Sequence, residues 1–212
     1  MHLRALAVFA HPDDATWPAG GTLARLAACG ADVRLLCLTC GVVGWRDDPD
    51  GPRRARAAAA ERELEAACHA LGIRRPIGGG CAPGTVATEC RQAAEYGITT
   101  ALATLRPRLV ITFGPDGLTG HPDHVAAGAV TTSAFQRVFA EPGAGAGPRL
   151  YCALGPTATG RLRPLTRQHE ASPVTTVVDV TSVAERKLAA LQRQRTLPLA
   201  RPGAVAATGL TL

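Results

Sequence analysis

The chain has 212 residues, of which 46% are hydrophobic, 19% charged and 4% aromatic, and its formal net charge is +6. This composition is typical of a folded globular protein, and the length suits one large domain or two small ones. No apolar run reaches the roughly 18–20 residues of a membrane-spanning helix. The N-terminus has neither a long apolar core nor a small-residue cleavage pattern, so we expect a cytoplasmic protein without a membrane partner.

The basic net charge raises the question of a nucleic-acid partner. The basic side chains are almost all arginines in short, scattered clusters, and the aromatic residues that would stack on bases are scarce. We therefore expect no nucleic-acid partner and favour a small-molecule partner. To account for the basic charge, we rank an anionic small molecule ahead of nucleic acid. The sequence neither predicts nor excludes a homo-oligomer.

The seven cysteines are an odd number without the spacing of a secreted disulfide framework. In a reducing compartment we expect all of them to be free thiols. Cys37 and Cys40 form a C-x-x-C pattern, but the glycines that follow do not open the helix that a redox motif needs. We interpret this pair as one buried strand residue and one residue at the strand end.

Apolar runs and helical patterns alternate along the chain. An apolar run at 4–9, a helical pattern at 19–28 and a second apolar run at 32–38 predict a strand–helix–strand unit with parallel strands. The polar segment 39–52 is expected to be a long loop. Further on, the pattern predicts helices at 53–71, 87–105 and 184–195 and another helix that ends near 139. It also predicts strands at 109–113, 149–154 and 174–180. A glycine-rich loop is expected at 76–84 and a loose tail after 198. The fold class is therefore α/β: a single domain over 1–212, a Rossmann-like three-layer sandwich on a mainly parallel sheet.

Two similar tetrapeptides follow two of the expected strands. The first is His11-Pro12-Asp13-Asp14 and the second is His121-Pro122-Asp123-His124. Ligands bind at the carboxyl edge of an open α/β sheet, so both segments should deliver imidazoles and carboxylates to one rim. Two histidines and a carboxylate, with an open position for water, are a common catalytic zinc arrangement.

Other interpretations of these segments have to be weighed. Either tetrapeptide alone could simply begin a helix, because proline suits the first helical position and aspartate suits the helix dipole. Gly20 and Gly21 lack the spacing of a dinucleotide loop and the lysine of a P-loop. No G-x-S-x-G elbow is present, so the sequence gives no support to a serine hydrolase.

At these residues the chain resembles the LmbE-like, or PIG-L, family of zinc-dependent N-deacetylases. Residues 10–14 match the family's A-H-P-D-D motif, and His121 to His124 match its H-P-D-H motif. Residues 63–72 resemble the family's helix with the pattern E…A…L-G. Residues 177–190 resemble its final strand and helix. The resemblance implies a hydrolase that removes an N-acyl group, most often acetyl, from an amino sugar or a glycoside-type small molecule.

The resemblance also implies a role for each residue of the two motifs. His11, Asp14 and His124 match the ligands of Zn²⁺, although a site with a carboxylate also accepts other divalent metals. Asp13 matches the general base that takes a proton from water. His121 matches the residue that supports the oxyanion and protonates the leaving amine, and Asp123 the carboxylate that orients His121.

The chain departs from the family pattern in regions expected to be close to the substrate. Ala15 stands where the family usually has glutamate, and Gln194 stands where a histidine is frequent. Trp45 and Arg46, in the long loop, are candidates for substrate contacts. Two alternatives therefore stay open: an amidase for another small conjugate, and a catalytically impaired relative that only binds metal or ligand.

Overall fold

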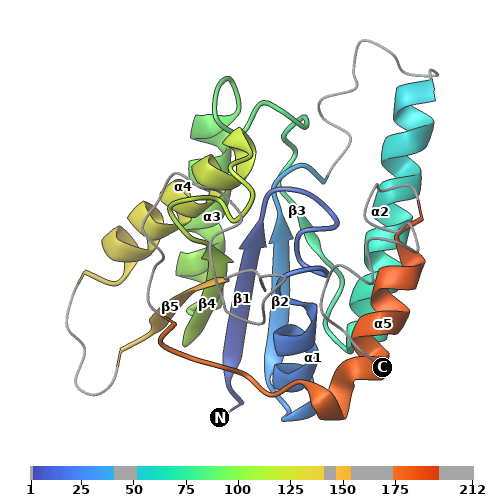
Figure 1. Ribbon diagram of the computed structural model, residues 1–212. Coiled ribbons are helices and arrows are strands. Elements are labelled where there is room, and N and C mark those ends of the chain that lie inside the picture. Colours follow the sequence, from blue (N-terminus) through green and yellow to red (C-terminus); the bar gives the residue numbers. More distant parts are fainter. Residues whose placement is uncertain (1, 41–51, 141–146, 154–173, 196–212) are drawn as a thin grey trace.

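The computed structural model describes residues 2–40, 52–140, 147–153 and 174–195, and a parallel sheet lies at the centre of this part of the chain (Figure 1). The strands are β1 (Arg4–Phe9), β2 (Asp32–Cys37), β3 (Ile77–Gly78), β4 (Leu109–Phe113) and β5 (Arg149–Ala153). Their order across the sheet is β3-β2-β1-β4-β5, and each neighbouring pair is parallel. The expected mainly parallel sheet is confirmed.

Helices cover both faces of this sheet. They are α1 (Gly20–Ala28), α2 (Pro52–Leu71), α3 (Arg91–Leu105), α4 (Pro122–Val138) and α5 (Ala184–Arg193), with a short 3-10 turn at Thr181–Val183 before α5. Figure 1 shows α1, α2 and α5 together on one side of the sheet and α3 and α4 on the other. The predicted single-domain, three-layer α/β sandwich is therefore confirmed.

The central strand β1 explains why its sequence is a continuous apolar run. It is paired on both edges and covered on both faces, and all its residues after Arg4 are buried. A strand buried on both faces has no need of polar alternation. At its carboxyl end the Phe9 ring packs edge-on against the Phe113 ring of β4, with centroids 4.9 Å apart. This aromatic pair lies directly before the segments that carry the two tetrapeptides.

Several expected boundaries differ from the structure. Residues 174–180, expected as a strand, are irregular and pair with none of the described strands; Val177 is 80% exposed, whereas Val180 packs against the core. The glycine-rich loop contains the unexpected two-residue strand β3, which pairs with β2. Helix α3 begins at Arg91 rather than at 87, because residues 82–90 are held in turns. Trp45, Arg46 and the tail after 198 lie outside the described residues.

The expectation that all seven cysteines are free thiols is wrong for one pair. Cys81 and Cys90 form a disulfide, with their Cα atoms 5.7 Å apart. Their pairing depends on the loop folding back on itself, which nothing in the cysteine spacing indicates. Cys37 and Cys40 are free thiols, as predicted: Cys37 is the buried last residue of β2, and Cys40, which is buried as well, follows the end of that strand. None of the described helices is long and apolar enough to cross a membrane.

Candidate metal centre

The two tetrapeptides meet where the order of the strands reverses. β1 and β4 are neighbours in the sheet, and the crossovers that follow them run in opposite directions, to β2 and to β5. The helices after the two strands therefore lie on opposite faces, which opens a crevice at the carboxyl ends of β1 and β4. The first tetrapeptide follows β1, and the second follows β4 after a short loop, so the sheet topology brings them together.

The second tetrapeptide is also the start of helix α4. His121 is the N-cap in an extended conformation, its Nδ1 accepts the backbone N–H of Asp123 at 3.1 Å, and Pro122 takes the first helical position. The second tetrapeptide therefore does begin a helix, as one interpretation of the sequence predicted. The turn places Asp123 and His124 inside the protein and leaves His121 exposed.

Two histidines and a carboxylate converge at the meeting point of the two segments. His11 Nδ1 lies 3.0 Å from His124 Nε2. The two oxygens of Asp14 complete the group: Oδ2 lies 3.3 Å from His11 Nδ1, and Oδ1 lies 3.2 Å from His124 Nε2. Asp14 and His124 are buried and His11 is half-buried, so solvent screens these atoms little from one another.

The outer partners of the two imidazoles determine which nitrogens carry protons. His11 Nε2 lies 3.0 Å from a carboxylate oxygen of Asp123, and His124 Nδ1 lies 3.1 Å from the backbone carbonyl of Gly117. Both partners only accept hydrogen bonds, so each of these outer nitrogens donates its proton. The inner nitrogens, His11 Nδ1 and His124 Nε2, consequently present lone pairs to each other and to Asp14.

Lone pairs on these adjacent nitrogen and oxygen atoms repel one another unless a cation or an additional proton lies between them. Ligand atoms about 2.0–2.1 Å from a tetrahedral zinc ion are about 3.3 Å apart, close to the separations found here. Burial lowers the pKa of His11, but hydrogen bonds and charge attraction from Asp14 and Asp123 outweigh it and raise the pKa from 6.5 to about 9. The residues present therefore fit a divalent metal.

His121 extends the cluster toward solvent. Ligand atoms of His11, His121 and His124 all lie within 4.8 Å of one another, so the three histidines could hold a metal ion. The Nδ1 of His121 is already engaged with the helix N-terminus, whereas the carboxylate of Asp14 directly faces both inner nitrogens. Burial and then the neighbouring His11 lower the pKa of His121, so it is less readily protonated than an isolated histidine.

Asp13 lies beside this cluster and remains half-buried. Its backbone carbonyl accepts the N–H groups of Thr16 and Trp17, which closes the turn after β1. Burial and the nearby charge of Asp14 raise the pKa of the Asp13 carboxyl. A raised pKa makes a carboxylate a better proton acceptor at neutral pH, as general-base chemistry requires.

The structure gives Asp123 a different partner from the one that the resemblance implied. Its carboxylate is fully buried and bonds His11, whereas His121 meets only its backbone N–H. The remaining lone pairs accept the backbone N–H groups of Gly84, at 2.6 Å, and Val86, at 3.0 Å. Sequence reasoning missed these two donors because backbone amides leave no signature in a sequence.

Gln194 is a second residue whose position only the structure reveals. It lies just beyond α5 and is 3% exposed, and its side-chain Nε2 donates a hydrogen bond to the Pro12 carbonyl at 2.6 Å. The C-terminal part of the described chain therefore supports the turn of the first tetrapeptide. Its departure from the family pattern marked the position in the sequence, but not the contact.

Comparison with known proteins identifies the family. The model of the PIG-L family, described as GlcNAc-PI de-N-acetylase, matches residues 6–135. The chain belongs to the PIG-L family. A 1D-myo-inositol 2-acetamido-2-deoxy-alpha-D-glucopyranoside deacetylase of Rhodococcus opacus is 32% identical over 236 residues, covering 91% of this chain and 81% of that protein. The predicted resemblance is thereby confirmed.

Two solved structures share the fold of this chain. The conserved protein TT1542 from Thermus thermophilus superimposes with a TM-score of 0.71 and 26% identity, over 98% of this chain and 86% of that one. GalB from Pseudomonas putida, a 4-carboxy-2-hydroxymuconate hydratase, gives a TM-score of 0.65 and 25% identity, over 91% and 79%. The second structure shows that a similar fold also occurs in a protein named for a different reaction.

Proposed function

We propose that this PIG-L protein is a zinc-dependent hydrolase that removes an N-acyl group, most readily acetyl, from an amino sugar or a glycoside-type small molecule. The observation that carries the proposal is the convergence of the inner nitrogens of His11 and His124 on the Asp14 carboxylate, with separations of 3.0–3.3 Å. The deacetylases among its relatives support the substrate class.

In this proposal His11, Asp14 and His124 hold the zinc ion. Their contacts leave the side of the cluster next to exposed His121 as the approach for substrate. When bound, zinc supplies a Lewis acid that acidifies water and polarises the acyl carbonyl. Asp123 holds the outer nitrogen of His11, so that the inner nitrogen keeps its lone pair directed at the metal position.

The proton transfers fall to the two residues that lie beside the ligands. Asp13, with its raised pKa, takes a proton from the attacking water. His121 has Nε2 left for chemistry because Nδ1 caps α4, and this nitrogen supports the oxyanion and gives a proton to the leaving amine. The products are a carboxylate and a free amine.

We place the protein in the cytoplasm, as one domain over residues 1–212 that acts on a small molecule and not on nucleic acid. None of the described helices could span a membrane, which is in keeping with this placement, and a reducing compartment would then expose the Cys81–Cys90 disulfide to reduction. Ala15, where the family pattern has glutamate, is buried in the core. The side chains of His11, Asp14 and His124 meet without a glutamate at this position.

Metal analysis combined with an assay for released amine tests the proposal. The purified protein should carry about one zinc ion and release amine from at least one member of a panel of N-acyl amino sugars. Asp13→Asn should keep zinc and lose about 10²–10⁴-fold in turnover, the usual scale for loss of a general base. His124→Ala should lose zinc, whereas His69→Ala, an exposed histidine in α2, should lose neither metal nor activity.

Three outcomes would contradict this assignment. Undiminished zinc in His124→Ala would show that the metal binds elsewhere. Loss of zinc in Asp13→Asn, together with its retention in Asp14→Ala, would exchange the roles of the two carboxylates. A zinc-loaded protein that releases no amine from any N-acyl substrate would favour the impaired relative, or a reaction such as the hydration for which GalB is named.

A further inference from the structure

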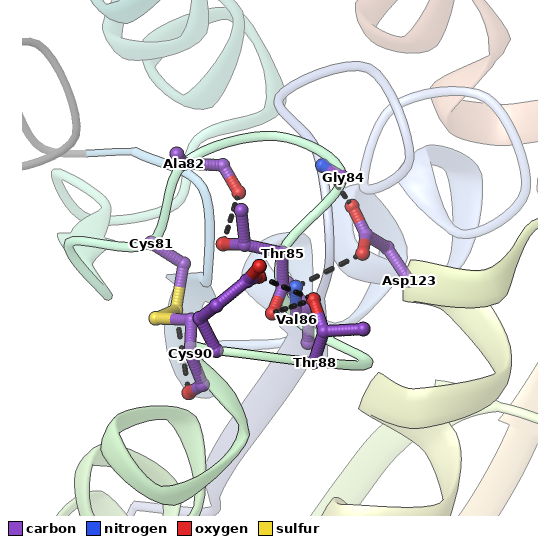
Figure 2. Close-up of a disulfide and its surroundings, with 9 residues drawn as sticks. Cys81, Ala82, Gly84, Thr85, Val86, Thr88, Cys90 and Asp123 are labelled. Atoms are coloured by element: carbon purple, nitrogen blue, oxygen red, sulfur yellow. Dashed lines mark hydrogen bonds between the residues drawn. A yellow bond between two sulfur atoms is a disulfide. The ribbon is translucent and has the colours of Figure 1, made fainter.

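The disulfide closes a loop that reaches the candidate metal centre. Cys81 and Cys90 are nine positions apart in the sequence, and the loop between them passes over the start of α4 (Figure 2). Two backbone N–H groups from this loop, those of Gly84 and Val86, point at the two oxygens of Asp123. The loop therefore connects the disulfide to a carboxylate that holds His11.

Asp123 connects this loop to His11 of the candidate metal centre. Asp123 is completely buried, and its carboxylate contacts the two loop amides on one side and His11 Nε2 on the other. An ionised carboxylate is stable at a buried position only while such donors satisfy it. Withdrawal of the loop would leave Asp123 short of two donors and would release the ring of His11 to change its orientation.

The loop has little packing of its own to hold it in place. Between the two cysteines, Val86 is the only fully buried residue among those described, whereas Pro83, Gly84, Thr88 and Glu89 are exposed. Gly84 has a φ of +87°, a conformation that favours glycine, and no heavy atom lies within 4 Å of the position of an added Cβ. Segments with few buried contacts open locally at low free-energy cost, and a covalent closure limits the conformations they can then reach.

Three of the five free cysteines are poorly placed to exchange with this pair. Cys37, Cys40 and Cys68 are buried, and burial raises the pKa of the Cys37 and Cys68 thiols, that of Cys68 to about 12. Such thiols carry almost no reactive thiolate at neutral pH. Cys81 is buried too, whereas its partner Cys90 is half-buried at the N-terminus of α3.

We propose that the Cys81–Cys90 bridge is a redox-sensitive positioning element of the metal centre. Closed, it holds the Gly84 and Val86 amides on Asp123 and thereby keeps His11 oriented; open, it weakens metal binding. A dithiol reductant supplies two electrons and two protons: the S–S bond breaks, two S–H bonds form, and the reductant becomes a disulfide. The effect on metal rests on the proposed function, whereas the effect on the loop does not.

The experiment compares the full-length protein in two redox states. One sample is oxidised with glutathione disulfide and the other is reduced with dithiothreitol, which is then removed under anaerobic conditions. Thiol titration after denaturation should count five thiols in the first sample and seven in the second. Amide hydrogen exchange, followed by NMR, then reports on Gly84 and Val86, and competition with a chromophoric chelator gives the zinc dissociation constant.

Reduction should speed exchange at Gly84 and Val86 and raise the zinc dissociation constant about 10–100-fold, the scale found when partners of metal ligands are removed. The double variant Cys81→Ser/Cys90→Ser should behave as the reduced protein in both redox states. Asp123→Asn should weaken zinc similarly, and reduction should then add little further effect. Cys29→Ser, which changes an exposed free cysteine at the end of α1, should respond to reduction like the unaltered protein.

Two results would overturn the proposal. The first is seven thiols in the oxidised sample, because the bridge would then not form. The second is unchanged exchange at Gly84 and Val86 after reduction, because the loop would then hold Asp123 without the bridge. If zinc binds in neither state, the proposed function fails instead, and the exchange rates alone decide whether the bridge orders the loop.

Discussion

The close approach of helix α4 to strand β4 makes Gly128→Ala a sensitive test of the architecture around the site. Gly128 lies one helical turn after His124 and is buried against the end of β4. A Cβ added there would lie 2.7 Å from the Phe113 carbonyl oxygen and 3.1 Å from that of Gly114. Both neighbours are backbone atoms, so the helix itself has to move away from the strand.

Two opposing effects determine how far Gly128→Ala changes the free energy of unfolding. Alanine in place of glycine stabilises a helix interior by roughly 0.5–1 kcal/mol. Overpacking against a fixed backbone costs roughly 1–3 kcal/mol, so we expect a net loss of about 1–2 kcal/mol. For a domain of this size that lowers Tm by roughly 2–8 °C.

Gly97→Ala in α3 is the matched control, because no heavy atom lies within 4 Å of its added Cβ. This variant should be more stable than the unaltered protein by roughly 0.5–1 kcal/mol, because only the gain in helix propensity applies. Urea unfolding measures both free energies of unfolding, and chelator competition measures the zinc dissociation constant. A shift of α4 moves His124 relative to His11, so Gly128→Ala should also weaken zinc, whereas Gly97→Ala should not. Equal stabilisation by the two variants would refute the tight contact between α4 and β4.

Three further predictions follow from contacts around the same cluster. Gln194→Ala should lower stability by about 1 kcal/mol and reduce kcat/KM while zinc stays bound, because the Pro12 carbonyl loses its donor; exposed Gln92→Ala should change neither quantity. Thr119→Ala should weaken zinc by less than about tenfold, since the Gly117 carbonyl still accepts from His124 Nδ1, and a larger loss in the chelator assay would make Thr119 the main partner. Removal of zinc present at 100 times its dissociation constant should lower stability by about 2.7 kcal/mol and Tm by about 5–10 °C without changing the circular dichroism at 25 °C; loss of helical signal would contradict a fold that stands without metal.

The sequence by itself determined most of the local elements and the residues that we propose carry the chemistry. Apolar runs and helical spacing depend on near neighbours in the chain, so they predict the strands Arg4–Phe9 and Leu109–Phe113 and the helices that follow them. The similarity of the two tetrapeptides and their positions after buried strands pointed to one shared site. That inference needed only the rule that parallel strands end at a common edge.

The tertiary structure decided which distant groups touch. Cys81 pairs with Cys90, the Asp123 carboxylate bonds His11 instead of His121, and Gln194 reaches Pro12. Residues 174–180 carry a strand-like pattern but are irregular and pair with none of the described strands. Each of these outcomes depends on how separate segments pack and on backbone amides that every residue possesses, and a pattern of side chains along one chain contains neither.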